Sequence, residues 1–169
     1  MHTCGLSRSW STRCAALALL IVSLAPEARP QGAPPGGSPG GSSTTVTYYA
    51  SYELNGGTAT QSNQTYTAAA TDTSAVWVAN SGALTLLNPT VVTSGNTSSQ
   101  DNSSFYGLNA GLLVTSGSAT VTGGSISTTG SGANGAFATG SGSSLVMSGT
   151  SITTGGDGGH AVMATQGGS

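Results

Sequence analysis

Two side chains that commonly bind metals, Asp157 and His160, stand three residues apart in the segment GGDGGHAV. A carboxylate and an imidazole at this spacing could hold a divalent cation between two turns. The glycine-rich calcium repeat requires stacked copies of its motif, and this single stretch does not match it. The alternative is a solvated turn in which glycine adopts a positive φ. The sequence favours the turn, so neither a metal site nor a cofactor is predicted.

Paired carboxylates are the second chemistry to consider, because glycoside hydrolysis needs two acids that flank the scissile bond. The acids after Pro30 are Glu53, Asp72, Asp101 and Asp157. The three aspartates fall in different repeats or in an insertion, at places that are not equivalent. No pair can be argued from them, so no catalytic residue is predicted and the chain is expected not to be an enzyme.

A contact surface is the third candidate. The insertion NTSSQDNSSFYGLN carries Asp101, Phe105 and Tyr106. Loops that leave a rigid scaffold often carry function, and aromatic side chains often anchor sugars or partner proteins. The alternative is that the two rings only cover the flank of the scaffold. With Asp157 and His160, these residues form the predicted contact surface, and the expected ligands are surface polysaccharides or host-cell glycans.

Charged residues make up only 5% of the chain, against roughly 25% in ordinary globular domains. There is no lysine, and the arginines are Arg8, Arg13 and Arg29, so everything from Pro30 onward lacks a permanent cation. Such a surface cannot neutralise phosphates, which excludes nucleic-acid binding. Anionic membrane surfaces are disfavoured for the same reason.

Residues 1–28 are typical of a secretory signal peptide: two arginines, the apolar run CAALALLIVSL and small residues follow one another. The apolar run is too short to span a bilayer, so the mature chain is not expected to insert into a membrane; an uncleaved anchor is the alternative. Cys4 and Cys14 both lie in this segment, so the exported chain would lack cysteine. A Pro/Gly/Ser linker, residues 29–43, follows. The predicted location is secreted or cell-surface.

Internal repetition dominates the rest of the chain. GLLVTSGSATVTGGSISTTGSGANG, from Gly111, aligns with AFATGSGSSLVMSGTSITTGGDGGH, from Ala136. The aligned pairs are Leu112 with Phe137, Gly117 with Gly142, Val121 with Val146 and Gly124 with Gly149, each 25 residues apart, and Ile126 with Ile152. An upstream unit aligns at an offset of 35, through Trp77 with Leu112, Gly82 with Gly117, Leu86 with Val121 and Val91 with Ile126. The insertion, residues 96–109, absorbs the difference. Periods of 20 to 50 residues indicate a solenoid.

Each repeat contains short runs rich in β-branched residues, separated by glycine and asparagine, and no window shows an apolar stripe at helical spacing. The sequence therefore predicts an all-β solenoid of about four coils over residues 44–169, with parallel sheets of strands about 4.8 Å apart. Leu112, Val121, Phe137 and Val146 are expected to point inward. Outward rows of threonine and serine are expected to hydrogen-bond along the stack.

The segments SAVWVANSGALTLLNPTVVTSGNTS, SSFYGLNAGLLVTSGS and GANGAFATGSGSSLVMSGTSITTGGDGGHAV resemble passenger repeats of secreted bacterial β-helix proteins in the pectin-lyase-like superfamily. The resemblance covers residues 48–169 and implies a right-handed parallel β-helix displayed at the cell surface. Such proteins are usually longer and many are adhesins or autotransporter passengers. We therefore expect a solenoid truncated at its C-terminal end, with an outer-membrane translocator as a partner if the chain is a fragment.

These observations predict a non-enzymatic, adhesin-like surface module. A polysaccharide lyase or hydrolase is the alternative, although the superfamily's lyases use a basic residue that the mature chain lacks. Ice binding is a third interpretation, because flat Thr-x-Thr rows can order water: Thr120 with Thr122 is one such pair, and Ser125 with Ser127 resembles it. Sequons that a glycosylating host could modify begin at Asn63, Asn96 and Asn102.

Overall fold

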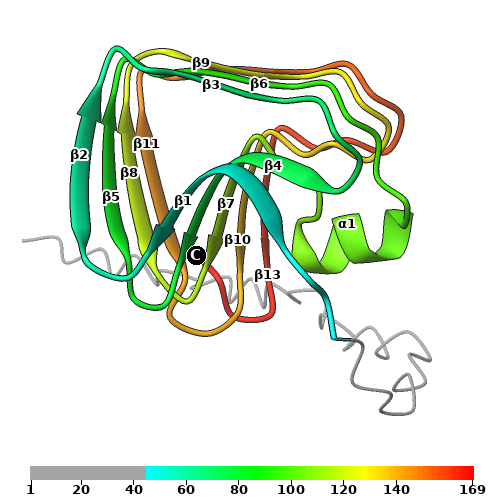
Figure 1. Ribbon diagram of the computed structural model, residues 1–169, viewed down its shortest axis with the longest axis horizontal. Helices are drawn as coiled ribbons and strands as arrows, with labels where there is room; N and C mark the ends of the chain where they lie inside the picture. Colours follow the sequence, from blue (N-terminus) through cyan, green and yellow to red (C-terminus); the bar gives the residue numbers. More distant parts are fainter. Residues whose placement is uncertain (1–44) are drawn as a thin grey trace, which may run out of the picture. The chain divides into compact units, whose positions relative to one another are not determined.

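Thirteen strands and one short helix make up residues 45–169, the part of the chain that the computed structural model describes (Figure 1). The predicted signal peptide, residues 1–28, and the predicted linker, residues 29–43, lie outside the described residues. In chain order the elements are β1 (Tyr49–Asn55), β2 (Thr58–Ser62), β3 (Thr65–Ala68), β4 (Thr73–Ala79), β5 (Ala83–Leu87), β6 (Thr90–Thr93), α1 (Gln100–Tyr106), β7 (Leu112–Thr115), β8 (Ser118–Thr122), β9 (Ser125–Thr128), β10 (Ala136–Thr139), β11 (Ser144–Ser148), β12 (Ser151–Thr154) and β13 (Val162–Thr165).

The strands form three sheets, each with one strand from every coil. Sheet A has the order β1-β4-β7-β10-β13, sheet B the order β11-β8-β5-β2, and sheet C the order β12-β9-β6-β3. All the strand pairs are parallel. Figure 1 looks down the stack, so the strands of one sheet lie one behind another. The predicted all-β solenoid of about four turns is confirmed.

The core follows from the alternation of side chains along each strand. In β8 the exposed Ser118, Thr120 and Thr122 alternate with the buried Ala119 and Val121. Inward-facing aliphatic side chains of successive coils stack on one another between the three sheets; the fully buried ones include Val78, Leu84, Leu86, Val91, Leu112, Val114, Val121 and Ile126. Burying each such side chain contributes roughly 1.5–3 kcal/mol, so stability accumulates from stacked coils and no coil is stable alone.

Between the second and third coils the predicted pairs are correct in sheets B and C, whereas in sheet A Trp77 pairs with Leu113 instead of Leu112. Between the third and fourth coils the predicted pair of Ile126 with Ile152 in sheet C is correct, and the pairs predicted in sheets A and B are wrong by one residue. Phe137 pairs with Leu113 instead of Leu112 and points away from the solenoid interior. Met147 takes the inward place opposite Val121, which leaves the side chain of Val146 57% exposed. The reason is the turn after β10, which has four residues where the turn after β7 has two. The sequence alignment matched the glycines of these two turns, and this displaced the aligned strands by one residue. In a strand, a displacement of one residue assigns each side chain to the opposite face of the sheet.

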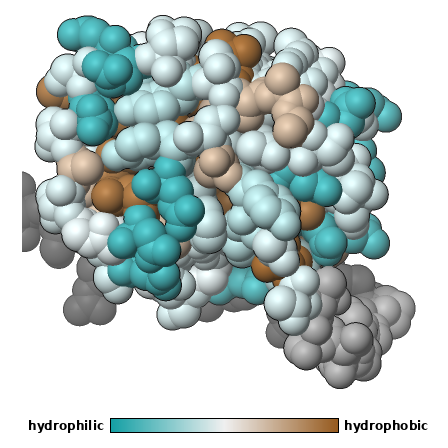
Figure 2. Space-filling model, in the orientation of Figure 1, coloured by the Kyte–Doolittle hydropathy of each residue, from teal (hydrophilic) through white to brown (hydrophobic). Residues whose placement is uncertain are grey.

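Polarity on the outer faces of sheets B and C comes from serine and threonine. Within the described residues, none of these outward hydroxyl groups hydrogen-bonds to another protein group, so the predicted bonds along the stack are wrong for both sheets. A contact of this kind occurs on sheet A, where the hydroxyl oxygens of Thr165 and Thr139 lie within hydrogen-bonding distance, 3.0 Å apart. Figure 2 accordingly shows a surface in pale colours of weak hydropathy, with only scattered teal and brown patches.

Candidate functional site

The insertion predicted as a contact surface folds into α1. Ser99 caps the start of the helix, its side chain accepting a hydrogen bond from the Asn102 backbone N–H at 3.2 Å. Gly107 ends the helix in the left-handed region, with φ +75°. Serine before a helix and glycine after it are the ordinary signals for a helix start and end. They were present in the sequence, although the segment has no apolar stripe.

Helix α1 covers part of the outer face of sheet A. Beneath it Leu113 and Phe137 are fully buried outside the solenoid core, with Trp77 and Met163 packed beside them. Gly107 lies directly against Leu113 and Phe137 and has no room for a side chain. Phe137, which the sequence analysis expected to point inward, thus anchors the helix to the outer face of the sheet.

Buried hydrogen bonds fix the orientation of α1. The Asn134 side chain donates from Nδ2 to the Ser103 carbonyl at 3.1 Å, and the Ser103 hydroxyl lies within bonding distance of the Leu108 and Gly132 carbonyls. Before the helix, Asp72 accepts from the Ser98 backbone N–H at 2.8 Å and from its hydroxyl at 2.5 Å. The bonds of Asn134 and Ser103 are buried, whereas those of Asp72 are exposed. A buried, satisfied polar network such as that of Asn134 and Ser103 specifies a single arrangement.

The C-terminal end of α1 is attached to the last two strands of sheet A. The Phe105 carbonyl accepts from the Thr165 hydroxyl at 2.8 Å, from Gln166 Nε2 at 3.1 Å and from the Thr139 hydroxyl at 3.3 Å. These contacts set the position of the next residue, Tyr106, above the sheet.

A groove of about 410 Å³ lies on sheet A beside this end of the helix. This volume is within the range of small-molecule sites, roughly 300–1,000 Å³. Its lining residues come from the approach to β1, the end of α1, and the ends of β4, β7, β10 and β13 with their turns: Tyr48, Trp77, Ala79, Asn80, Tyr106, Thr115, Ser116, Thr139, Gly140 and Gln166.

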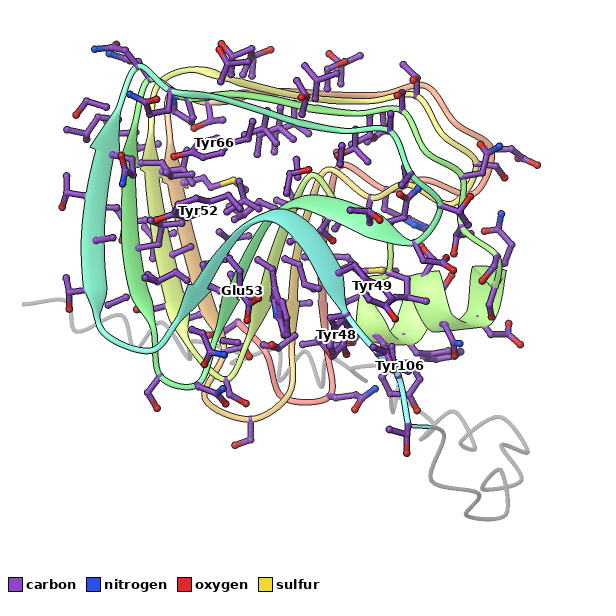
Figure 3. All side chains as sticks on the ribbon, viewed as in Figure 1. Tyr48, Tyr49, Tyr52, Glu53, Tyr66 and Tyr106 are labelled. Atoms are coloured by element: carbon purple, nitrogen blue, oxygen red, sulfur yellow. The ribbon has the colours of Figure 1, made fainter. Side chains whose placement is uncertain are left out.

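Three aromatic side chains line the groove. The rings of Tyr48 and Trp77 have centroids 5.4 Å apart and an interplanar angle of 42°. Trp77 donates from Nε1 to Thr115 Oγ1 at 2.7 Å, which fixes the orientation of the indole ring. Figure 3 shows Tyr48 and Tyr106 close together near the end of α1. Burial raises the pKa of Tyr48 above its ordinary value, and the neighbouring Tyr106 raises it further, so the Tyr48 hydroxyl is neutral near pH 7.

Amide and hydroxyl groups complete the lining. Asn80, Ser116 and Gln166 directly follow the ends of β4, β7 and β13 in sheet A. Asn80 Nδ2 donates to Asn55 Oδ1 at 2.5 Å, and Asn55 Nδ2 donates to Glu53 Oε1 at 3.1 Å. Every lining residue is uncharged, so the groove offers ring faces together with donors and acceptors.

Of the five predicted contact residues, only Tyr106 lines this groove. Phe105 exposes 57% of its surface to solvent, and Asp101 is exposed in the first turn of α1. Asp157 and His160 lie in the turn between β12 and β13, where the His160 backbone N–H donates to Asn134 Oδ1 at 3.0 Å. Within residues 45–169 no group of three metal-binding side chains occurs. The structure therefore does not bring the five residues together.

The sequence did not reveal Tyr48, Trp77, Asn80 and Gln166 as site residues. Trp77 was aligned with the inward Leu112, whereas it pairs with Leu113 and faces outward. A bulky aromatic residue at an outward position of a strand would have indicated the site. Trp77 can be recognised as such a residue only when the register of β4 is assigned correctly. Gln166 belongs to the site because the chain turns back to sheet A after β12.

No protein-family model, curated protein or solved structure matches this chain. No helix in residues 45–169 has the length and apolar character needed to cross a bilayer.

Proposed function

We propose that this chain is an exported, non-enzymatic module that binds glycans through the groove on sheet A and acts in surface attachment, as adhesin-like passenger domains do. The observation that carries the proposal is the groove lining: three aromatic rings, two side-chain amides and no charge on one rigid face.

This lining matches the chemistry of a neutral sugar. The apolar C–H face of a pyranose packs against an aromatic ring. The rings of Trp77 and Tyr106 lie in the groove lining, where a sugar could pack against them. The sugar hydroxyls both donate and accept hydrogen bonds, as do the amides of Asn80 and Gln166. The scaffold under the groove is held by strand pairing, so little ordering entropy is lost on binding.

Export is supported by the signal-peptide pattern of residues 1–28. The absence of catalysis is supported by the lining itself, in which no carboxylate is present to act as acid, base or nucleophile. A ligand would be held and not converted.

Two adjacent residues of α1 provide the test. Tyr106 lines the groove, whereas Phe105 points to solvent and contributes only its backbone carbonyl. In a glycan array followed by calorimetry with the full chain, Tyr106→Ala is expected to weaken binding of a neutral glycan at least tenfold, and Phe105→Ala is expected to leave it unchanged. Failure of the wild-type chain to bind any glycan, or an equal loss in both variants, would refute the proposal.

Glycoside hydrolysis is the second candidate, and Glu53 is the observation in its favour. Glu53 is the strand partner of Trp77 in sheet A, and it bonds through Asn55 to the groove residue Asn80. It is a single carboxylate, whereas the usual mechanisms need two. If the purified chain releases reducing ends from a polysaccharide, and Glu53→Gln abolishes the release, this candidate replaces the first.

A further inference from the structure

The outer face of sheet B carries a two-dimensional array of side chains, most of them serine or threonine, in strict strand register. The three rows that cross the sheet are Thr58, Ala83, Ser118 and Ser144; then Thr60, Thr85, Thr120 and Val146; and then Ser62, Leu87, Thr122 and Ser148. The sequence analysis singled out one pair of this array, Thr120 with Thr122. Thr58 with Thr60 on β2 is a second Thr-x-Thr pair, and the rows across the sheet emerge only when strands far apart in the chain are placed side by side.

The hydroxyl groups of this face are free. In the described residues none of the nine serine and threonine side chains of the three rows has a hydrogen-bond partner, and most of them are exposed. Each hydroxyl can therefore donate one hydrogen bond to water and accept others. No residue of the three rows is charged. Valine and threonine have the same shape, so Val146 extends the middle row without a step in height.

The spacing of the array is set by the backbone. Neighbouring strands are about 4.8 Å apart, and residues two apart on one strand are about 6.7 Å apart. Figure 1 shows β2, β5, β8 and β11 one behind another along one side of the solenoid. Hydroxyl and methyl groups thus repeat in two directions, and Ala83, Val146 and Leu87 are the positions in the three rows that lack a hydroxyl.

We propose that the outer face of sheet B binds ice. A regular array of hydroxyl and methyl groups holds a first layer of water in a repeating pattern, because hydroxyls anchor water molecules while methyl groups restrict those between them. Such a layer can join the lattice of an ice crystal, whereas charged side chains would orient water around themselves. This function is independent of the groove, which lies on sheet A.

Sheet B is assigned in preference to the other two sheets on geometry. Helix α1 and the aromatic side chains interrupt the outer face of sheet A. The strands of sheet C have four residues each and present two outward positions, whereas those of sheet B have five residues and present three.

The test is thermal hysteresis of the purified full chain, together with inhibition of ice recrystallisation. Wild-type chain is expected to show both. Thr120→Lys, in the centre of the face, is expected to reduce hysteresis at least fivefold, and Thr60→Lys on β2 is a second variant with the same expectation. Ser127→Lys, on sheet C in the same coil as Thr120, is the matched control and should keep hysteresis within twofold of wild type. Circular dichroism verifies that each variant is folded.

Two results would overturn the assignment. The first is a folded wild-type chain that has no effect on ice growth at millimolar concentration. The second is a loss of hysteresis in Ser127→Lys as large as that in Thr120→Lys, since ice binding would then not belong to sheet B.

Discussion

The outer faces of sheets A and B start from the same scaffold and end with opposite properties. On sheet A, Leu113 and Phe137 are buried under α1, and hydroxyl and amide groups bond to one another and to the helix. On sheet B, Thr120 and Val146 occupy the corresponding coils and stay exposed. The inner faces of both sheets contribute to one core. A single insertion between β6 and β7 therefore turns one face into a packed, concave site and leaves the other face uncovered.

The comparison teaches that repeat proteins separate stability from recognition. Core positions must obey the repeat, because each coil stacks on the next. Outer positions are constrained only by what covers them. The largest stability effects outside the core should accordingly lie under α1, while equivalent changes on sheet B should cost little.

Phe137→Ala is expected to have the largest effect in this comparison. The ring is fully buried between sheet A and α1, and removing a buried phenylalanine side chain costs about 3–5 kcal/mol. Val146→Ala, in the next strand of the chain but on the bare face, should change the free energy of unfolding by less than about 0.5 kcal/mol. Urea denaturation followed by circular dichroism measures both. Similar losses in the two variants would show that α1 does not pack on sheet A.

Comparing Gly107→Ala with Gly142→Ala separates the cost of a collision between α1 and sheet A from the cost of backbone strain. Gly107 and Gly142 both adopt positive φ, +75° and +83°. An added Cβ at Gly107 would collide with Leu113 and Phe137, whereas at Gly142 it would meet open space. Strain costs each variant on the order of 1 kcal/mol, and the collision should cost Gly107→Ala about 1–2 kcal/mol more. The difference between their denaturation midpoints measures that collision. Equal midpoints would mean that the helix end can move away from the sheet.

Asp72→Asn tests the polar attachment that precedes the helix. Asn tolerates the left-handed backbone of this position, φ +57°, but it cannot accept both hydrogen bonds that Ser98 donates to the carboxylate. The expected loss is about 1 kcal/mol. Asp157→Asn is the control, because no side-chain hydrogen bond of Asp157 occurs in the described residues, and it should be neutral. A loss in the control equal to that in Asp72→Asn would point to general electrostatics instead of the attachment.

The sequence was sufficient to predict the core of this fold because the core is periodic. Leu86 with Val121 and Val91 with Ile126 were placed in the correct pairs, since the turn between β5 and β6 and the turn between β8 and β9 both have two residues. The fourth coil has a longer turn after β10, and its register could not be read from glycines, because the turns after β7 and β10 both contain glycine although their lengths differ.

The groove was hard to predict for a different reason. Its lining joins Tyr48, Tyr106 and Gln166, which come from three separate parts of the chain: the approach to β1, the end of α1 and the turn after β13. No periodicity relates these residues. Tyr106 was found because it sits in a segment that breaks the repeat, and Tyr48 and Gln166 were missed because nothing local distinguishes them. The site becomes visible only when the helix is docked on the sheet.

The smallest predicted effect concerns alkaline stability. Burial raises the pKa of the Tyr48 hydroxyl above 10.0, and Tyr106 raises it further. Above pH 10 the unfolded chain loses this proton first, so the stabilisation is complete below pH 10 and is lost as the pH rises through the pKa of the folded state. Tyr48→Phe should therefore flatten the decline of unfolding free energy between pH 9 and pH 11. An unchanged slope in urea titrations would indicate that the Tyr48 hydroxyl is hydrated, so that the groove is open to water beside Trp77.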